Sequence, residues 1–480
     1  MQTHYVQSMR NYFMNVIIFS RKKIRLTCFF ICLIGSVFST ANQAQSSLLL
    51  ENVRVIVGDG TVLENTSLLI EDGVISAIGS ASELQLSDTL SNTTERFDYS
   101  GKTVIPALID AHAHLGYESY TSWGAQNYSR ENLIDHLNRY AYYGFSAVFS
   151  AGTDPDDLAL ALQQDQLAGE VGGARFLFAA GMAPPGQGPN NQFLEHALQV
   201  ERRTGMTVLR GLVNPEQARA AVREVAAKEI AFIKIWVDDR GGTQQKLNPE
   251  LYTAVIEEAQ LSGIDVVVHQ QAAADMPGLI GAGASGFLHG RIGAALTNSI
   301  VQQAQAADVF VVPNLGLAEL RLEALAEDSF LMLTMPASSV PRLSATNGQR
   351  QSGSQFNSQL ENELQSSFMQ LVDSGVDIVL GTDAGALPDH PFGYSGHREL
   401  EIFVRLGMSP LQAITAATST AAERLGLNDL GLLQPGFSAD LIVLNDNPLL
   451  DIRNTRSINQ VYLRGELIDR TALAAKFIAP

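Results

Sequence analysis

Short apolar runs alternate with amphipathic stretches through the middle of the chain, from about residue 105 to residue 425. Runs of this length, separated by segments of helical periodicity such as residues 215–228, are typical of parallel strands in β/α units. Eight such units predict an α/β fold of the (β/α)8 TIM-barrel type, whose chemistry lies at the C-terminal ends of the strands. The first strand leads into Asp110, and the others are expected at residues 147–149, 176–179, 232–236, 265–268, 286–288, 309–312 and 378–380.

Both ends of the chain carry a different pattern. Residues 47–104 form short period-2 runs around Asp-Gly turns, which predicts antiparallel strands. Residues 439–444 and 461–465 repeat that pattern near the C-terminus, so we expect one small β-sandwich built from both ends. A Ser-, Gln- and Asn-rich segment at 344–358 is expected to be a surface loop. The expected parts are an export signal at 1–44, the barrel at 105–425, and the two parts of the sandwich at 45–104 and 426–480.

The first 44 residues have the pattern of an export signal. Basic residues at 21–25 precede an apolar run at 26–38, and small residues follow it. The run is shorter than the roughly 20 residues that span a bilayer, so cleavage is expected rather than a stable membrane anchor. Cys28 and Cys32, the two cysteines of the chain, lie in this segment, so the mature protein would contain no disulfide. The expected location is the periplasm or the cell exterior.

Charge limits the range of partners. The chain of 480 residues has a formal net charge of −18, and losing the first 44 residues, which carry five basic and no acidic residues, would bring it to −23. Such a surface repels nucleic acid, so nucleic-acid binding is not expected. The sequence is compatible with a homo-oligomer and leaves the number of subunits open.

The first predicted barrel strand ends in a metal-ligand pattern. His112 and His114 are two residues apart, and residues i and i+2 of a strand point to the same side. Both imidazoles can therefore point at one metal ion. The pair alone is weak support, because surface histidines also pair by chance.

Polar residues at the ends of other predicted strands strengthen this interpretation. Lys234 interrupts the apolar fourth strand, His269 and His289 end the fifth and sixth, and Asp383 follows the eighth. Each has an ordinary alternative, since a strand-end histidine can simply bond a loop and Asp383 could cap the next helix. Together, at the same ends of successive strands, they predict a metal site.

With these residues in place, the chain resembles the amidohydrolase superfamily of metal-dependent hydrolases. Within it, the chain is most similar to imidazolonepropionase-like and Xaa-Pro dipeptidase-like members with a binuclear site. The similarity extends to the segments 381–385, 397–400 and 433–441 near the C-terminus. One departure is Ala107, where the family usually has glycine.

The resemblance implies a ligand set for two divalent ions. By the family's pattern His112, His114 and Asp383 hold one ion, His269 and His289 hold the other, and Lys234 bridges both as an N-carboxylated lysine. Zinc suits such a mixed site, and manganese, cobalt or iron are also compatible with it. A buried lysine readily loses its proton and can then add CO2. The alternative is a structural lysine paired with Asp238 or Asp239.

The resemblance further implies hydrolysis by a metal-bridging hydroxide, with Asp383 passing the proton to the leaving amine. The expected substrate is a small amide or peptide-like molecule, such as a dipeptide or an N-acyl amino acid. Hydrolysis of a cyclic amide or lactone, or deamination, is the alternative on the same scaffold, and a metal-binding protein without catalysis is a third. Candidate substrate contacts are His397, Arg240 and Tyr117.

Overall fold

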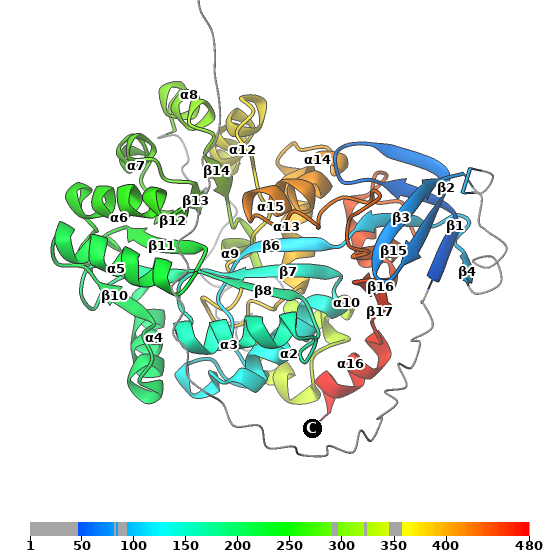
Figure 1. Ribbon diagram of the computed structural model, residues 1–480, viewed down its shortest axis with the longest axis horizontal. Coiled ribbons are helices and arrows are strands. Elements are labelled where there is room, and N and C mark those ends of the chain that lie inside the picture. The colour runs from blue at the N-terminus through cyan, green and yellow to red at the C-terminus, as the bar shows by residue number, and fades with distance from the viewer. Residues whose placement is uncertain are drawn as a thin grey trace, which may run out of the picture. The chain divides into compact units, whose positions relative to one another are not determined.

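The computed structural model describes residues 47–80, 83–84, 94–289, 296–320, 324–344 and 358–479. Its strands form one eight-stranded, one six-stranded and one three-stranded sheet (Figure 1). The strands are β1 Ser47–Ile56, β2 Val62–Glu71, β3 Val74–Gly79, β4 Glu95–Asp98, β5 Thr103–Pro106, β6 Leu108–Ala113, β7 Phe145–Ser150, β8 Arg175–Phe178, β9 Ala180–Ala183, β10 Leu209–Gly211, β11 Phe232–Val237, β12 Asp265–Gln270, β13 Gly286–Leu288, β14 Phe310–Val312, β15 Leu441–Leu444, β16 Ile458–Leu463 and β17 Glu466–Leu467.

Helices lie between most of the strands. The α-helices are α2 Arg130–Tyr142, α3 Asp156–Leu167, α4 Asn191–Thr204, α5 Pro215–Ala227, α6 Pro249–Leu261, α7 Met276–Ala282, α8 Asn298–Ala306, α9 Gly316–Glu319, α10 Ser329–Met332, α12 Ser358–Asp373, α13 Tyr394–Arg405, α14 Pro410–Ala416, α15 Ser419–Arg424 and α16 Arg470–Ile478. Short 3-10 helices are η1 Ala125–Asn127, η2 Ala273–Asp275, η5 Leu325–Glu327, η6 Ala337–Ser339 and η7 Ile452–Arg456. Asparagine side chains begin α4, α5 and α6, and a proline follows the asparagine in the last two, which is a strong helix-start signal.

The two smaller sheets contain the parallel strands of the predicted β/α units. They run in the orders β6-β7-β8 and β10-β9-β11-β12-β13-β14. Ala179 alone separates β8 from β9, so these two form one interrupted strand shared by both sheets. The segment after α12 makes parallel bridges at Ile378 to β14 and at Ala384 to β6. The predicted α/β class is confirmed. The strand β10 was not expected, because its sequence Leu209-Arg210-Gly211 contains no apolar run.

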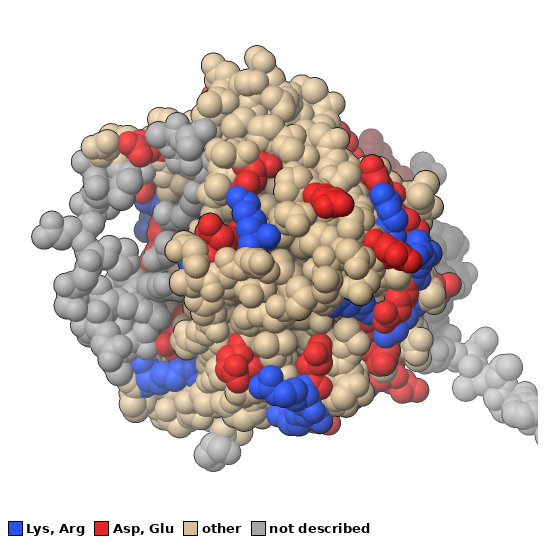
Figure 2. All heavy atoms as spheres, turned by 90° about the vertical axis from the view of Figure 1, so that its left-hand side faces the viewer, with Lys and Arg blue, Asp and Glu red and all other residues tan. Residues whose placement is uncertain are grey.

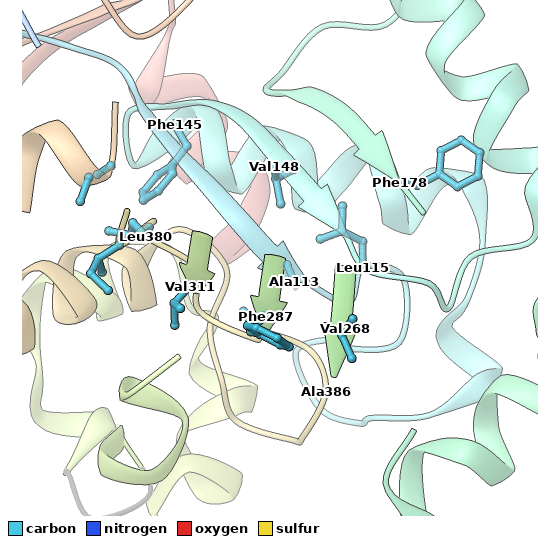
Figure 3. Packing of buried hydrophobic residues seen from close by; sticks show 14 of the residues in the cluster. Ala113, Leu115, Phe145, Val148, Phe178, Val268, Phe287, Val311, Leu380 and Ala386 are labelled. Atoms are coloured by element: carbon cyan, nitrogen blue, oxygen red, sulfur yellow. The ribbon is translucent and has the colours of Figure 1, made fainter. Parts of the chain in front are cut away.

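Two apolar clusters lie on opposite sides of these parallel strands. Val267 belongs to one and Val268 to the other, as Val312 and Val311 do on β14. In Figure 3 the side chains of Val268, Phe287 and Val311 lie beside one another on β12, β13 and β14. Burial on both faces explains why these strands appear in the sequence as continuous apolar runs.

The chain ends meet in the eight-stranded sheet, as predicted. β5 lies between β1 and β15 and pairs with them in parallel and antiparallel directions, respectively. The expected sandwich is seen as a single hydrogen-bonded sheet. Its strands share one apolar cluster through Val104 and Val443, while the alternating residues Ile105 and Ile442 join the main core.

The predicted signal at 1–44 and most of the predicted loop at 344–358 lie outside the described residues. Within the described part of the chain, no helix is long and apolar enough to cross a membrane. On the face seen in Figure 2, acidic and basic side chains lie next to one another. Ion pairs such as Arg219–Glu257 and Arg223–Glu258 link α5 to α6 at the surface.

Candidate metal centre and active site

His112 and His114 lie at the C-terminal end of β6 and face Asp383. Their Nε2 atoms are 3.4 Å and 3.2 Å from the Oδ1 atom of Asp383. All three side chains are buried. Nε2 of His112 and Oδ1 of Asp383 make no hydrogen bond within the described chain, although both are shielded from solvent. Buried polar atoms without partners are rare, so this pair is suited to a missing ligand such as a cation.

The outer nitrogens of both rings are held by other side chains. Nδ1 of His112 donates to Oδ1 of Asn314 at 2.8 Å, and Nδ1 of His114 is 2.8 Å from Oγ1 of Thr153. Because Asn314 offers an acceptor there, His112 carries its proton on Nδ1 and presents a lone pair at Nε2. Such outer contacts are typical of metal-binding histidines.

Asp383 lies in a turn that is fixed to β6. Its backbone N–H donates to the carbonyl of His112 at 2.6 Å, and its φ of 60° is in the left-handed region. Asp110 accepts from the hydroxyl of Thr382 at 2.6 Å and from the hydroxyl of Tyr140 at 2.7 Å. Burial raises the pKa of Asp110 to about 6, against the effect of these hydrogen bonds. The turn that carries Asp383 is thus anchored through Asp110 and Thr382.

Lys234 lies on β11 with 1% of its surface exposed. Phe232, two residues earlier, belongs to the same apolar cluster as Val267 and Val312, and Lys234 points to that side of the strands as well. Burial holds the pKa of the Lys234 amine well below its ordinary value. Asp238 instead contacts His269 and Arg240, and Lys234 has no ion pair with a described residue. The structural pair considered as the alternative is therefore absent from the described residues.

His269 and His289 are the remaining two candidate metal ligands. Their ring centroids are 4.5 Å apart, and the ring of His289 is 5.0 Å from that of His112. His269 donates from Nε2 to Asp238 at 3.0 Å, which leaves Nδ1 as its acceptor nitrogen. One potential ligand atom from each of His112, His289 and Asp383 lies within 4.8 Å of the other two. This spacing fits a metal ion.

Burial favours the uncharged form of the histidines in this site. Burial is the main cause that lowers the pKa values of His112, His269 and His289 well below the ordinary value. For Asp383, burial alone would raise the pKa, but the adjacent His114 and His289 hold it well below its ordinary value. Neutral imidazoles and an ionised carboxylate are the forms that bind metal ions.

These groups line one cavity of about 360 Å³. Its described lining contains a single carboxylate, that of Asp383, and several apolar side chains. A cavity of this size suits a small molecule. The lining residues are His112, His114, Pro189, Asn190, Phe193, Lys234, Trp236, Arg240, His269, Gln271, His289, Leu317, Asp383, Ala386 and Leu387.

Of the three candidate substrate contacts, one lies in the cavity lining and two lie elsewhere. Arg240 lines the cavity. Tyr117 is fully buried away from the described lining, and its hydroxyl donates to the carbonyl of Thr153 at 2.7 Å. His397 bonds the hydroxyl of Thr455 at 3.0 Å and the carbonyl of Tyr143 at 2.9 Å, also away from the lining. The position of the last two gives no support to a role in substrate binding.

Sequence reasoning missed the side chains that hold the ligands, namely Asp110, Thr153 and Asn314. Asn314 follows β14 and Thr153 follows β7, each within three residues of the strand end. Every polar residue just beyond a predicted strand was therefore a candidate. Which of them contact a histidine depends on the spatial neighbourhood of the strands.

Comparison with known proteins agrees with this geometry. The model of the amidohydrolase family matches residues 103–468. The chain belongs to the amidohydrolase family. The predicted resemblance is thereby confirmed, and the chain is a hydrolase that acts on carbon–nitrogen bonds of the amide or peptide-like type.

Several amidohydrolases are similar over most of their length. Ochratoxinase of Aspergillus niger is 24% identical over 464 residues, covering 90% of this chain and 88% of its own. Imidazolonepropionase of Deinococcus deserti is 23% identical over 426 residues, covering 84% of this chain and 90% of its own. The solved structure of a Xaa-Pro dipeptidase with bound methionine superimposes with a TM-score of 0.67, at 23% identity, covering 88% of this chain and all of that one.

Proposed function

We propose that this amidohydrolase is an exported binuclear metalloenzyme that cleaves the amide bond of a dipeptide or an N-acyl amino acid. The observation that carries the proposal is Lys234, which is buried without an ion pair to a described residue and lines the same cavity as four histidines and Asp383. Its contact with a described residue is a cation–π one, since Nζ lies 5.7 Å from the centroid of the Trp236 ring. An N-carboxylated Lys234 would add a carboxylate between the two groups of ligands.

We propose that these residues hold two divalent ions. His112, His114 and Asp383 would hold one, His269 and His289 the other, and carboxylated Lys234 both. The orphaned Nε2 of His112 and Oδ1 of Asp383 support this assignment. Divalent ions held there, with zinc as the expected metal, would supply Lewis-acid chemistry that activates a water and polarises the substrate carbonyl.

Side chains of the protein would orient the metal ligands and transfer the proton of the attacking water. Asp383 lies next to His112 and His114, so its carboxylate can accept the proton of the attacking water and pass it to the leaving amine. Asn314 and Thr153 keep the imidazoles oriented through their Nδ1 atoms. The cavity would exclude bulk water once a substrate fills it, which strengthens these interactions.

Two further parts of the proposal concern architecture and location. We infer that the parallel bridges at Ile378 and Ala384 close an eight-stranded barrel. Its strands would be β6, β7, the interrupted strand β8–β9, β11, β12, β13, β14 and the segment at Ile378. We also infer that residues 1–44 direct export and are removed. Fractionation of cells that express the full chain, compared with a chain lacking 1–44, tests export. Equal cytosolic retention of both would contradict it.

Turnover tests the function itself. Metal-loaded protein lacking residues 1–44 is assayed on a set of dipeptides, N-acyl amino acids, cyclic amides and lactones. We expect hydrolysis of dipeptides or N-acyl amino acids that is lost on chelation and restored by zinc. Activity confined to the cyclic substrates would replace the proposal with the alternative.

A further inference from the structure

Arg240 is the one guanidinium in the described lining of the cavity. It follows β11 in a left-handed conformation, with φ of 52°, and precedes Gly241 and Gly242 in the same turn. The left-handed region is unfavourable for a residue with a side chain, and such residues concentrate where function fixes a direction. Here the backbone turns the side chain of Arg240 towards the cavity instead of the solvent.

Two fixed contacts hold the guanidinium in place. Nη1 of Arg240 is 3.0 Å from Oδ2 of Asp238, and Nη2 donates to the carbonyl of Gly188 at 3.2 Å. The Gly188 segment is itself tied down, because Gln244 accepts from the N–H of Gly188 and donates to the carbonyl of Pro189. The arginine is therefore oriented before any ligand binds, which reduces the entropy cost of recognition.

The guanidinium retains unused donors. Arginine has five N–H groups, and the two contacts above engage two of them. Nε is buried and has no hydrogen-bond partner within the described chain. A buried donor without a partner is costly, and a planar carboxylate matches the fork of an arginine. Asp238 cannot satisfy these donors as well, since its Oδ2 also accepts from His269.

Apart from Arg240, the described cavity lining includes several apolar side chains and a single carboxylate. Phe193, Trp236, Leu317 and Leu387 give the cavity an apolar side, and Asp383 is the only carboxylate in its described lining. The carboxylate of Asp238, which pairs with Arg240, is not part of this described lining.

We infer that Arg240 binds the free carboxylate of the substrate and thereby restricts the enzyme to anionic amides with an apolar side chain. The inference rests on the proposed function and deepens it, because it identifies the group that separates amino-acid amides from uncharged amides. Asp238 and Gly188 are the positioning groups for this contact.

A matched pair of substrates tests this role. N-acetyl-L-leucine carries the carboxylate, and N-acetyl-isoamylamine is the same amide without it. For wild-type enzyme we expect kcat/KM to favour the acid by about 100-fold, because a site built for a charged group is left unpaired by the analogue. Arg240→Ala should lower kcat/KM for the acid by about 100-fold, mainly through KM, and change the uncharged substrate by less than about threefold.

Two controls accompany the assay. Arg240→Lys keeps the charge but loses the fork and should give an intermediate loss. Arg223→Ala removes an exposed arginine that pairs with Glu258 on the surface and should leave both substrates unaffected. Metal content is measured for every variant, so that a loss of metal is not mistaken for a loss of recognition.

Each outcome of these assays either supports or contradicts the role of Arg240 in binding the substrate carboxylate. Equal losses on both substrates, or no loss on either, would overturn the role of Arg240. If wild-type enzyme hydrolyses neither substrate, the proposed function fails for this class, and calorimetric binding of N-acetyl-L-leucine to the metal-loaded protein decides the role separately. Binding weakened by about 100-fold in Arg240→Ala supports it, and unchanged binding contradicts it.

Discussion

Three side chains that line the cavity stand on left-handed backbone. They are Arg240 with φ of 52°, Asp383 with φ of 60° and His289 with φ of 86°. A left-handed conformation costs a residue with a Cβ atom roughly 1–2 kcal/mol. At Asp383 the hydrogen bond from its N–H to the carbonyl of His112 offsets part of this cost. Local strain at these positions turns three side chains inwards at strand ends.

Replacing the carboxylate of Asp383 should reduce turnover with little effect on metal binding. Asp383→Asn keeps one oxygen next to His112 and His114 but cannot accept the proton of the attacking water. We expect the variant to retain most of its metal and to lose kcat by at least about 1000-fold. Metal analysis and steady-state kinetics measure both. Wild-type turnover in this variant would exclude Asp383 as the proton carrier.

Between elements, the most important connection joins β6 to the segment after residue 378. Asp110 accepts from the N–H of His112 and the N–H of Thr382 through Oδ1, and from the hydroxyls of Thr382 and Tyr140 through Oδ2. A single buried carboxylate thus links the strand that carries two histidines to the turn that carries Asp383.

Removing the hydrogen bond between Thr382 and Asp110 should displace Asp383, although neither Thr382 nor Asp110 belongs to the described lining of the cavity. Thr382→Val deletes the hydroxyl that donates to Oδ2 of Asp110 at 2.6 Å and accepts from the N–H of Ala384 at 3.1 Å, and should cost about 2 kcal/mol of stability. We expect kcat to fall by about 10-fold or more, because misplacement of a catalytic group is costly. Thr382→Ser retains the hydroxyl and is the matched control. Urea unfolding and kinetics compare them, and equal behaviour of Val and Ser would show that the hydroxyl has no such role.

His397 connects α13 to η7 and has a pH-dependent effect on stability. Burial lowers its pKa to about 3. In the unfolded chain the ring takes up a proton near pH 6.5, and the folded chain does not, so its contribution to stability is lost as pH falls below 6.5.

Between pH 7 and pH 5 this single histidine should remove about 2 kcal/mol of unfolding free energy. His397→Gln should lower stability at pH 7, because a buried bonding partner changes, and should flatten the pH dependence in this window. Substitution of His196, which is only partly buried, is the control. An unchanged pH slope in His397→Gln, measured by urea unfolding, would contradict this account.

The sequence predicted the positions of strands better than it predicted the contacts between side chains. The apolar runs located β11, β12 and β13 almost to the residue. The strand-end rule proposed five metal ligands, and the interruption of an apolar strand proposed the sixth, Lys234; all six line the cavity. It could not place Tyr117 or His397, since both are polar residues that bond buried loops. Nor did it foresee the irregular pairing of β6 with β7 after Asp110, because a shift of register depends on both strands.

At the scale of the whole molecule, the two chain ends close one sheet beside the parallel strands. β5 passes from that sheet into β6 through Ala107, so the sheet is continuous in sequence with the strand that bears His112 and His114. The molecule as a whole is acidic, with a formal charge of −18, whereas the cavity gathers histidines, Lys234 and Arg240 around one carboxylate. This contrast suits a site that binds cations and a small anionic substrate.

The number of metal ions bound per chain tests the central claim most directly. Protein lacking residues 1–44 is purified without chelator, and its metal content is measured by mass spectrometry beside that of Lys234→Ala. The account predicts two divalent ions per wild-type chain and a clear loss in the variant, because Lys234 would bridge both ions. One ion per chain, unchanged in Lys234→Ala, would contradict the binuclear site and make Lys234 a structural residue.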